Sequence, residues 1–328
     1  MALYDINGNL MLEDVELADY YVEEMEDTIS KVKALQTEPN LTFLIITDIH
    51  AYYVSGAGEL YKTSINNMRY LLRDIPCDGV INLGDAIEGY ATKTLAQSYG
   101  AAVTKEFRKI SIHYYMAVGD HDDNRYHNNT NDDRLTVPER YQLFISPVKS
   151  VVSDTTGLNY YVDYAEFKIR MIVLNAVADY TYSYDAGTRA WFAEITQNIP
   201  TGYKVLLCTH ISPIGTWNYQ GRTPYNATDI VTALNGVDLM AIVCGHNHAD
   251  AVFDSPFRGI TLCCEKFEND SVDPSTRPSG SVQPQRTLET ASEDCWTVCV
   301  IRPNSQKINF VRFGAGSDYE IDYGGAEV

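Results

Sequence analysis

Acidic and histidine side chains follow several apolar runs of the sequence, each time where the run ends. Apolar runs separated by helix-length stretches predict buried β-strands. Strands of an α/β sheet form their binding crevice at their carboxyl ends, so these side chains are expected to converge. They are Asp48 and His50 after 41–47, Asp85 after 79–83, Asp120, His121 and Asp122 after 112–118, His210 after 203–208, and His246 and His248 after 239–244.

Mixed carboxylate and imidazole groups indicate transition-metal chemistry. They suit Mn, Fe, Zn, Co or Ni, whereas a site made of oxygen ligands alone would favour Mg or Ca. Five of the seven histidines in the chain lie in these clusters. One Asp-x-His or His-x-His pair alone would indicate no more than a solvated loop. Gly84, Gly119 and Gly245 stand directly before three of the clusters, where a glycine lets the backbone turn sharply and approach an ion.

The ordered set of motifs resembles the calcineurin-like metallophosphoesterase superfamily, in a bacterial or phage-type form. The family pattern runs DxH, GDxx, GNH[DE], H and GHxH, and the resemblance spans roughly residues 41–250. The matching segments are Asp48-x-His50, Gly84-Asp85, Gly119-Asp120-His121-Asp122, His210 and Gly245-His246-x-His248.

The resemblance implies a ligand set and a reaction. Two divalent transition-metal ions, with Mn, Fe and Zn as the first candidates, would be held close together. Such a pair can share and acidify a water molecule, so we expect in-line attack of a bridging hydroxide on a phosphate mono- or diester. One ion would be held by Asp48, His50, Asp85 and His248, and the other by Asp85, Asp120, His210 and His246, with Asp85 bridging.

Two residues beside the ligands are candidates for catalysis. His121 would be the histidine that binds no ion and, when protonated, stabilises charge on the phosphoryl oxygens or protonates the leaving group. Asp122 would orient His121, with a solvent-facing loop carboxylate as the equal alternative. The substrate is expected to be a small phosphorylated molecule, because the net charge of −19 and the pI near 4.6 disfavour long nucleic acids and anionic membranes.

The chain departs from the family pattern at Asp120, where the family usually has asparagine. A third carboxylate beside Asp48 and Asp85 makes the site less electropositive, so we expect slower turnover or tighter metal retention. The residues after Asp85 are Ala86-Ile87-Glu88-Gly89. They lack the Asp-Arg-Gly of Ser/Thr protein phosphatases and the metal-ligating tyrosine that purple acid phosphatases carry three positions after the aspartate.

The same pattern predicts an α/β fold, which the resemblance specifies as a four-layer sandwich of two facing β-sheets flanked by helices. Residues 1–40 are interpreted as a hairpin around Asn7-Gly8 followed by a helix from about 13 to 36, and 41–328 as one phosphoesterase domain. Polar insertions are expected at 122–134, as a surface loop, and at 265–294, as a lid or mobile segment.

The cysteine count and the lack of targeting signals bear on where the protein is found. An odd count of seven cysteines, no signal-peptide pattern and no long apolar run predict a soluble, cytoplasmic protein. The alternative function is a non-catalytic or weakly active phage or prophage module that keeps the fold for binding or assembly. The hairpin sequence LYDINGNLML resembles openings of phage tail-associated proteins, which leaves virion association open; His121 argues against a purely structural site. The sequence leaves the oligomeric state undetermined.

Overall fold

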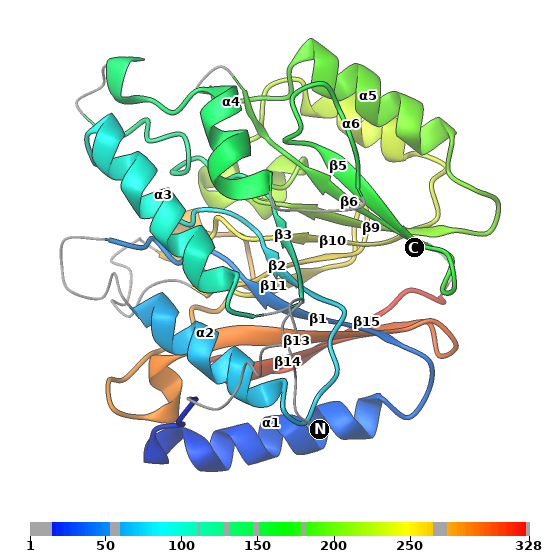
Figure 1. Cartoon of the computed structure of the whole chain (residues 1–328). Helices are drawn as coiled ribbons and strands as arrows, with labels where there is room; N and C mark the ends of the chain where they lie inside the picture. The colour runs from blue at the N-terminus through cyan, green and yellow to red at the C-terminus, as the bar shows by residue number, and fades with distance from the viewer. Residues whose placement is uncertain are drawn as a thin grey trace.

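Two large β-sheets form the centre of the molecule (Figure 1). The computed structural model describes residues 15–52, 60–110, 112–127, 131–146, 151–178, 181–264 and 274–325, so the predicted hairpin at 1–12 lies outside the described residues. The first sheet has the order β15-β14-β13-β1-β2-β3 and the second has the order β11-β12-β10-β9-β6-β5-β4.

The first sheet combines a parallel half and an antiparallel half. β1, β2 and β3 run parallel, and β13 pairs with β1 in the antiparallel sense. β14 and β15 extend the antiparallel half. The strands are β1 (Leu41–Ile46), β2 (Gly79–Asn82), β3 (His113–Met116), β13 (Cys295–Arg302), β14 (Lys307–Gly314) and β15 (Tyr319–Asp322).

The second sheet is parallel at its centre and antiparallel at its edges. β6, β9, β10 and β12 are parallel neighbours, whereas β5 and β11 pair in the antiparallel sense. The strands are β4 (Val152–Ser153), β5 (Tyr160–Tyr164), β6 (Ile169–Leu174), β9 (Lys204–Thr209), β10 (Leu239–Cys244), β11 (Ala251–Phe253) and β12 (Gly259–Thr261). A separate two-stranded pair joins β7 (Val177–Ala178) to β8 (Thr181–Tyr182).

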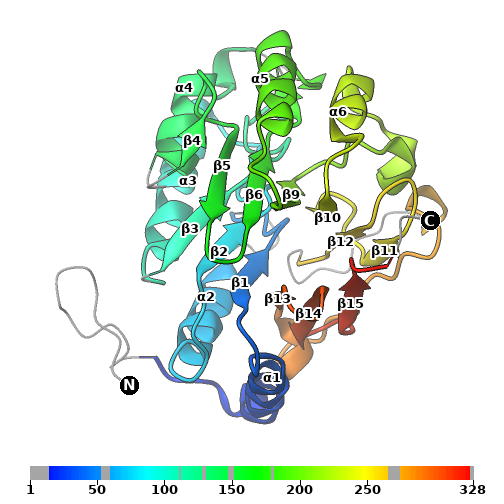
Figure 2. The ribbon, with the colours of Figure 1, turned by 90° about the vertical axis from the view of Figure 1, so that its right-hand side faces the viewer.

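Helices cover the outer faces of both sheets, as Figure 2 shows from the side. α1 packs on β13 and β14, while α5 and α6 lie together over the second sheet. The helices are α1 (Val22–Leu35), α2 (Leu60–Leu71), α3 (Lys93–Phe107), α4 (Val137–Arg140), α5 (Ala186–Gln197) and α6 (Ala227–Leu234). The four-layer arrangement predicted from the resemblance is confirmed.

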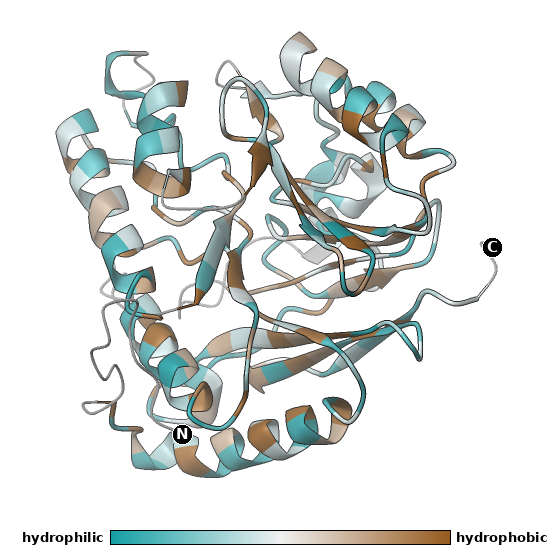
Figure 3. Ribbon diagram, turned by 45° about the vertical axis from the view of Figure 1, so that its right-hand side comes forward, coloured by the Kyte–Doolittle hydropathy of each residue, from teal (hydrophilic) through white to brown (hydrophobic). Residues whose placement is uncertain are grey.

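The strands of the second sheet supply side chains to two different apolar cores. On β9, Leu206 and Cys208 belong to the core between the sheets, whereas Val205 and Leu207 pack under α5 and α6. This alternation follows from the two-residue period of a strand. It explains why the strands appear in the sequence as continuous apolar runs, drawn mostly in brown and pale colours in Figure 3.

The N-terminal helix is shorter than predicted. Residues 15–18 are not helical, a short 3-10 turn covers Asp19–Tyr21, and α1 begins at Val22. The carbonyl of Val15 accepts a hydrogen bond from Arg73 at 2.7 Å, which ties this extended segment to the body of the molecule. Among the described residues, no helix has both the length and the apolar character needed to cross a membrane.

The prediction of a surface loop over 122–134 is wrong for its first four residues. Asp122, Asp123 and Asn124 are 0% exposed and Arg125 is 8% exposed. Burial of this polar segment is possible because its groups have hydrogen-bond partners. Arg125 pairs with Asp123 at 2.8 Å, and the Asn124 amide donates to the carbonyls of Ala91 and Asp133.

The second predicted insertion is described only from residue 274 onward. Its described part packs against the body of the protein: Val282 pairs with Asp250 through backbone hydrogen bonds, and Arg286 donates to the carbonyl of Glu293. The described part of the predicted lid or mobile segment, residues 274–294, is therefore packed against the rest of the protein. Residues 265–273 lie outside the described part of the chain.

Candidate metal centre

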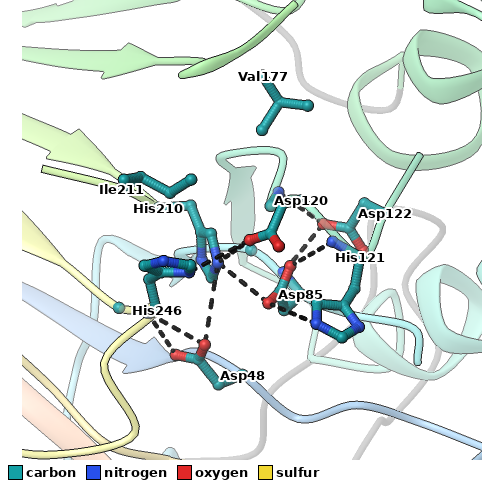
Figure 4. A network of polar contacts seen from close by, with 12 residues as sticks. Asp48, Asp85, Asp120, His121, Asp122, Val177, His210, Ile211 and His246 are labelled. Atoms are coloured by element: carbon teal, nitrogen blue, oxygen red, sulfur yellow. Dashed lines mark hydrogen bonds and ion pairs between the residues drawn. The ribbon is translucent and has the colours of Figure 1, made fainter. Parts of the chain in front are cut away.

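Five loops bring the predicted ligands together, one after each of β1, β2, β3, β9 and β10. Three of these strands belong to the first sheet and two to the second, so the site joins the ends of the two sheets. Figure 4 shows Asp48, Asp85, Asp120, His210 and His246 directed toward one another. All seven predicted ligands fall into close groups of possible metal ligands.

The first group consists of Asp48, His50 and His248. The Nε2 atoms of His50 and His248 are 3.1 Å apart, and Nε2 of His248 is 3.4 Å from Oδ1 of Asp48. Two ligand atoms bound to one ion at about 2.1 Å are themselves about 3.0–3.4 Å apart. The group therefore has the spacing of three ligands around a single ion.

The second group consists of Asp85, Asp120, His210 and His246. Nε2 of His210 lies 3.1 Å from Oδ2 of Asp85 and 3.3 Å from Oδ1 of Asp120. Nδ1 of His246 lies 3.2 Å from the same Asp120 oxygen. Oδ2 of Asp85 is also 3.8 Å from Nε2 of His50, so this carboxylate stands between the two groups.

Backbone hydrogen bonds link these loops directly. The amides of Asp48 and His50 donate to the carbonyls of Gly84 and Asp85 at 2.9 and 3.0 Å, and the amide of Gly245 donates to His210 at 3.1 Å. Five of the ligands have a positive φ, a conformation that residues other than glycine rarely adopt. Their φ values are 53° at Asp48, 42° at His50, 53° at Asp85, 69° at His246 and 48° at His248.

The glycines predicted to allow close approach do so at all three positions. A Cβ on Gly84, whose φ is +111°, would overlap the backbone nitrogen of Gly119 and the ring of His210. A Cβ on Gly119 would overlap the carboxylate and backbone nitrogen of Asp85. A Cβ on Gly245 would overlap Thr47 and the carboxylate of Asp48. Each glycine therefore leaves room for a ligand that belongs to a neighbouring loop.

The charges of the ligands depend on one another. Burial raises the pKa of Asp48, but His210 and His248 outweigh burial and lower it to about 2. Burial acts to lower the pKa of His210, yet Asp85, Asp120 and Asp48 raise it well above its ordinary value. A proton on His210 thus balances the carboxylates when no cation does.

His121 lies beside both ligand groups, and its side chain is 19% exposed. Its Nε2 is 4.0 Å from Oδ2 of Asp85, and its Nδ1 is 2.6 Å from the carbonyl of Glu88. That carbonyl accepts a hydrogen bond from Nδ1, which directs Nε2 toward the ligands. Burial acts to lower the pKa of His121, but Asp85, Asp120 and the Glu88 carbonyl raise it overall.

Asp122 has a different environment from the one expected. Its carboxylate accepts hydrogen bonds from the backbone amides of Asp85, Ala86, Ile87 and Gly119, at 3.0, 2.8, 3.3 and 2.8 Å. The expectation of a solvent-facing carboxylate is wrong, since the residue is 0% exposed. The structure places Asp122 as the anchor of the loop that carries Asp85, and all four of these contacts go to backbone amides.

A cavity of about 170 Å³ opens beside the ligands. Its walls include Asp85, Asp120, His121 and His246 on one side. Tyr126, Tyr182, Tyr219 and Arg222 belong to its lining as well. The cavity thus combines possible metal ligands with phenol groups and a guanidinium.

The sequence profile of the calcineurin-like phosphoesterases matches residues 41–250 of the chain. The chain belongs to this family. No curated protein matches the sequence. The family match covers every predicted ligand, from Asp48 to His248.

Solved structures with the same fold include two with a TM-score above 0.5. A dimetal phosphatase from Danio rerio has a TM-score of 0.62 at 14% identity, with 88% of this chain and 100% of that chain covered. GAP50, described as the anchor in the inner membrane complex of Plasmodium, has a TM-score of 0.52 at 10% identity, with coverages of 86% and 89%. At sequence identities this low, the similarity shows only that these proteins share the fold of this chain.

Several residues near the site were missed by sequence reasoning. Oε2 of Glu88 lies 3.2 Å from Nδ1 of His50, and Glu88, His50 and His121 form a third close group of possible ligands. The only signal was the position of Glu88 three residues after Asp85 in the family motif. Tyr182 and Arg222 had no motif to mark them, because the fold brings Tyr182 to Asp120 and Arg222 to Tyr182 from distant parts of the chain.

Proposed function

We propose that this calcineurin-like phosphoesterase holds two divalent transition-metal ions and hydrolyses a small phosphate mono- or diester. The observation that carries the proposal is the pair of ligand groups, spaced at 3.1–3.4 Å, with Asp85 standing between them. Oxygen and imidazole ligands together suit Mn, Fe or Zn. When bound, two such ions supply an activated water molecule and neutralise charge on the phosphoryl oxygens.

The buried polar atoms of the site fit bound cations. Oδ1 of Asp120 and Nε2 of His210 are buried and, although they lie 3.3 Å apart, neither makes a hydrogen bond within the described part of the chain. A buried polar atom without a partner is costly unless an ion or water satisfies it. Both atoms belong to the second ligand group, where a cation would satisfy them together.

His121 is the residue proposed to handle a proton. Its Nδ1 is held by the Glu88 carbonyl, so Nε2 is the atom that faces the cavity and the ligands. Asp85, Asp120 and the Glu88 carbonyl raise the pKa of His121 against the effect of burial, which increases the share of the imidazolium relative to an isolated histidine. Nε2–H can then donate to a phosphoryl oxygen or to the leaving group of the ester.

The cavity supports a small substrate. Its volume of about 170 Å³ is below the roughly 300–1,000 Å³ of pockets that enclose drug-sized ligands. A phosphoryl group and its nearest atoms fit inside, and the rest of the ester would extend past the rim. Arg222 at this rim donates to Tyr182 and Gln220, at 3.3 and 3.0 Å, so its positive charge is available to an anionic substrate.

Hydrolysis of nitrophenyl phosphate and bis-nitrophenyl phosphate with added Mn²⁺ tests the proposal. We expect two metal equivalents per chain and activity in the wild type. His121→Ala should retain both ions and lose at least about 100-fold in turnover, the usual contribution of a general acid. His113→Ala is the matched control, because His113 is an exposed histidine on β3 and should leave turnover unchanged.

The second candidate function is a non-catalytic or weakly active module that uses the fold for binding or assembly, as in a phage or prophage particle. The observation in its favour is the third carboxylate, Asp120, together with a fold shared with a protein described as an anchor. Metal binding without hydrolysis of either ester, in wild type and His121→Ala alike, would support this candidate and overturn the enzyme.

A further inference from the structure

The two oxygens of the Asp120 carboxylate face different groups. Oδ1 lies 3.3 Å from Nε2 of His210 and 3.2 Å from Nδ1 of His246. Oδ2 faces away from these histidines, toward the hydroxyls of Tyr126 at 2.5 Å and Tyr182 at 3.1 Å. One oxygen of this carboxylate therefore contacts the histidines of the second ligand group, and the other contacts two tyrosines.

Two phenol protons suit a carboxylate oxygen better than the amide nitrogen of an asparagine, toward which each hydroxyl would have to turn its lone pair. A tyrosine hydroxyl keeps its proton at neutral pH and can donate one hydrogen bond. Oδ2 of Asp120 has lone pairs for both donors, whereas the amide nitrogen of an asparagine would itself be a donor. The tyrosine pair is thus complementary to the residue by which this chain departs from the family pattern.

The donors are themselves held in place by further contacts. The hydroxyls of Tyr126 and Tyr182 are 3.1 Å apart, and Nη1 of Arg222 donates to the Tyr182 hydroxyl at 3.3 Å. The guanidinium of Arg125 lies over the Tyr182 ring, 5.3 Å from its centroid. Arg222 donates to a lone pair of the Tyr182 oxygen, so the single proton of that hydroxyl remains available for donation to Asp120 or to the Tyr126 oxygen, each 3.1 Å away.

We propose that Tyr126 and Tyr182 are positioning residues that make Asp120 a single-oxygen metal ligand. Their hydrogen bonds hold Oδ2 away from the ion and draw charge from the carboxylate. Asp120 then occupies one coordination position, as a neutral amide oxygen would, and a position that a chelating carboxylate would fill stays open to water or phosphate. This inference rests on the proposed dinuclear site.

The test removes the two tyrosine hydroxyls and measures the binding and absorption of a metal ion instead of the rate of hydrolysis. Tyr126→Phe, Tyr182→Phe and the double variant are loaded with Co²⁺, whose visible absorption weakens as its coordination number rises. Without the donors, Asp120 is free to chelate through both oxygens. We expect the double variant to absorb more weakly. Because a chelating carboxylate supplies one more ligand atom, it should also retain one of its two Co²⁺ ions about 10-fold more tightly in competition with a chelator, whereas loss of a partner that only orients a ligand would weaken retention.

The same substitutions in an Asp120→Asn background provide the internal control, since an amide does not chelate through two oxygens. In the Asp120→Asn background, the Tyr→Phe substitutions should change Co²⁺ retention by less than about 2-fold. Losing a residue that hydrogen-bonds to a metal ligand typically has a much larger effect. Tyr164→Phe is the matched control for losing a phenol hydrogen bond, because Tyr164 contacts Tyr115 instead of a ligand.

The possible outcomes separate the two proposals. Weaker or unchanged Co²⁺ binding in the double variant, with an unchanged spectrum, overturns the positioning role and indicates ordinary packing. An equal effect in both the Asp120 and Asn backgrounds also overturns it. A wild-type protein that binds no Co²⁺ at all instead overturns the proposed dinuclear function.

Discussion

Oε2 of Glu88 lies 3.2 Å from Nδ1 of His50, while Nε2 of His50 faces His248. A carboxylate on the far nitrogen of a metal-binding histidine fixes the tautomer and the ring orientation, and its loss typically costs about 10–100-fold in metal affinity. We predict a loss of that size for one ion in Glu88→Ala, measured by chelator competition. Glu88→Gln, which keeps an acceptor, should lose less, and Glu106→Gln on α3 should lose nothing. Wild-type affinity in Glu88→Ala would exclude this role.

Asp122 is predicted to matter for stability more than for the reaction. Asp122→Ala leaves four buried backbone amides without their acceptor, and each such donor costs about 1–3 kcal/mol. Because water can fill part of the space, we expect the free energy of unfolding to fall by about 3–5 kcal/mol in urea titrations. The exposed Asp132→Ala should change it by less than about 0.5 kcal/mol. Unchanged stability with lost turnover at full metal content would assign Asp122 to catalysis.

Chelation of the metal should destabilise the protein, and more so at higher pH. The pKa of His210 is raised above its unfolded value, mainly by Asp85, although burial acts against this. Protonated His210 therefore stabilises the ion-free protein fully below the unfolded pKa, and this stabilisation is lost as the pH rises through the folded pKa. Metal ions replace that proton, so their contribution grows with pH.

Thermal unfolding in excess Mn²⁺ and in excess chelator, at pH 6 and pH 8, measures this effect. We expect the difference in Tm between the two conditions to be larger at pH 8. Calorimetry in buffers of different ionisation enthalpy should also detect proton release on metal binding. A difference that narrows with pH would contradict the assignment of His210 as a proton-exchanging ligand.

Gly245→Ala is predicted to remove an ion from the first ligand group. The added methyl group would overlap Thr47 and the Asp48 carboxylate, which also accepts the His246 amide. Relief of this overlap moves Asp48, and overpacking of this kind costs about 1–3 kcal/mol of stability. Metal analysis should give about one equivalent fewer than in wild type. Gly325→Ala, where the added methyl group would meet nothing closer than a side-chain nitrogen of Arg258 at 3.9 Å, serves as the control.

The ligand set was accessible from the sequence because each member follows an apolar run. The two-residue and helical periods locate strand ends, and parallel strand ends meet in space. Asp48, Asp85 and His210 were therefore expected to lie close together without knowledge of contacts, and the structure brings them together. That these side chains come from both sheets was not predicted, because apolar runs do not show which strands share a sheet.

The remaining features could not be predicted because they depend on packing between distant segments. Asp122 and its neighbours form a polar run, which indicates an exposed loop unless one knows that backbone amides 35 to 37 residues away need an acceptor. Tyr182 reaches Asp120 across 62 residues, and Arg222 reaches Tyr182 across 40. No local sequence pattern indicates contacts between side chains this far apart in the chain.

The hydrogen bonds that join the loop of Asp48 to that of Asp85 run between backbone atoms. Replacing a ligand side chain would remove contacts such as the one between the Asp48 carboxylate and the His246 amide, but it would leave those backbone bonds in place. The link between the two loops therefore does not depend on the chemistry performed in the crevice. A descendant of this protein could therefore exchange hydrolysis for recognition through a few substitutions, without rebuilding its architecture.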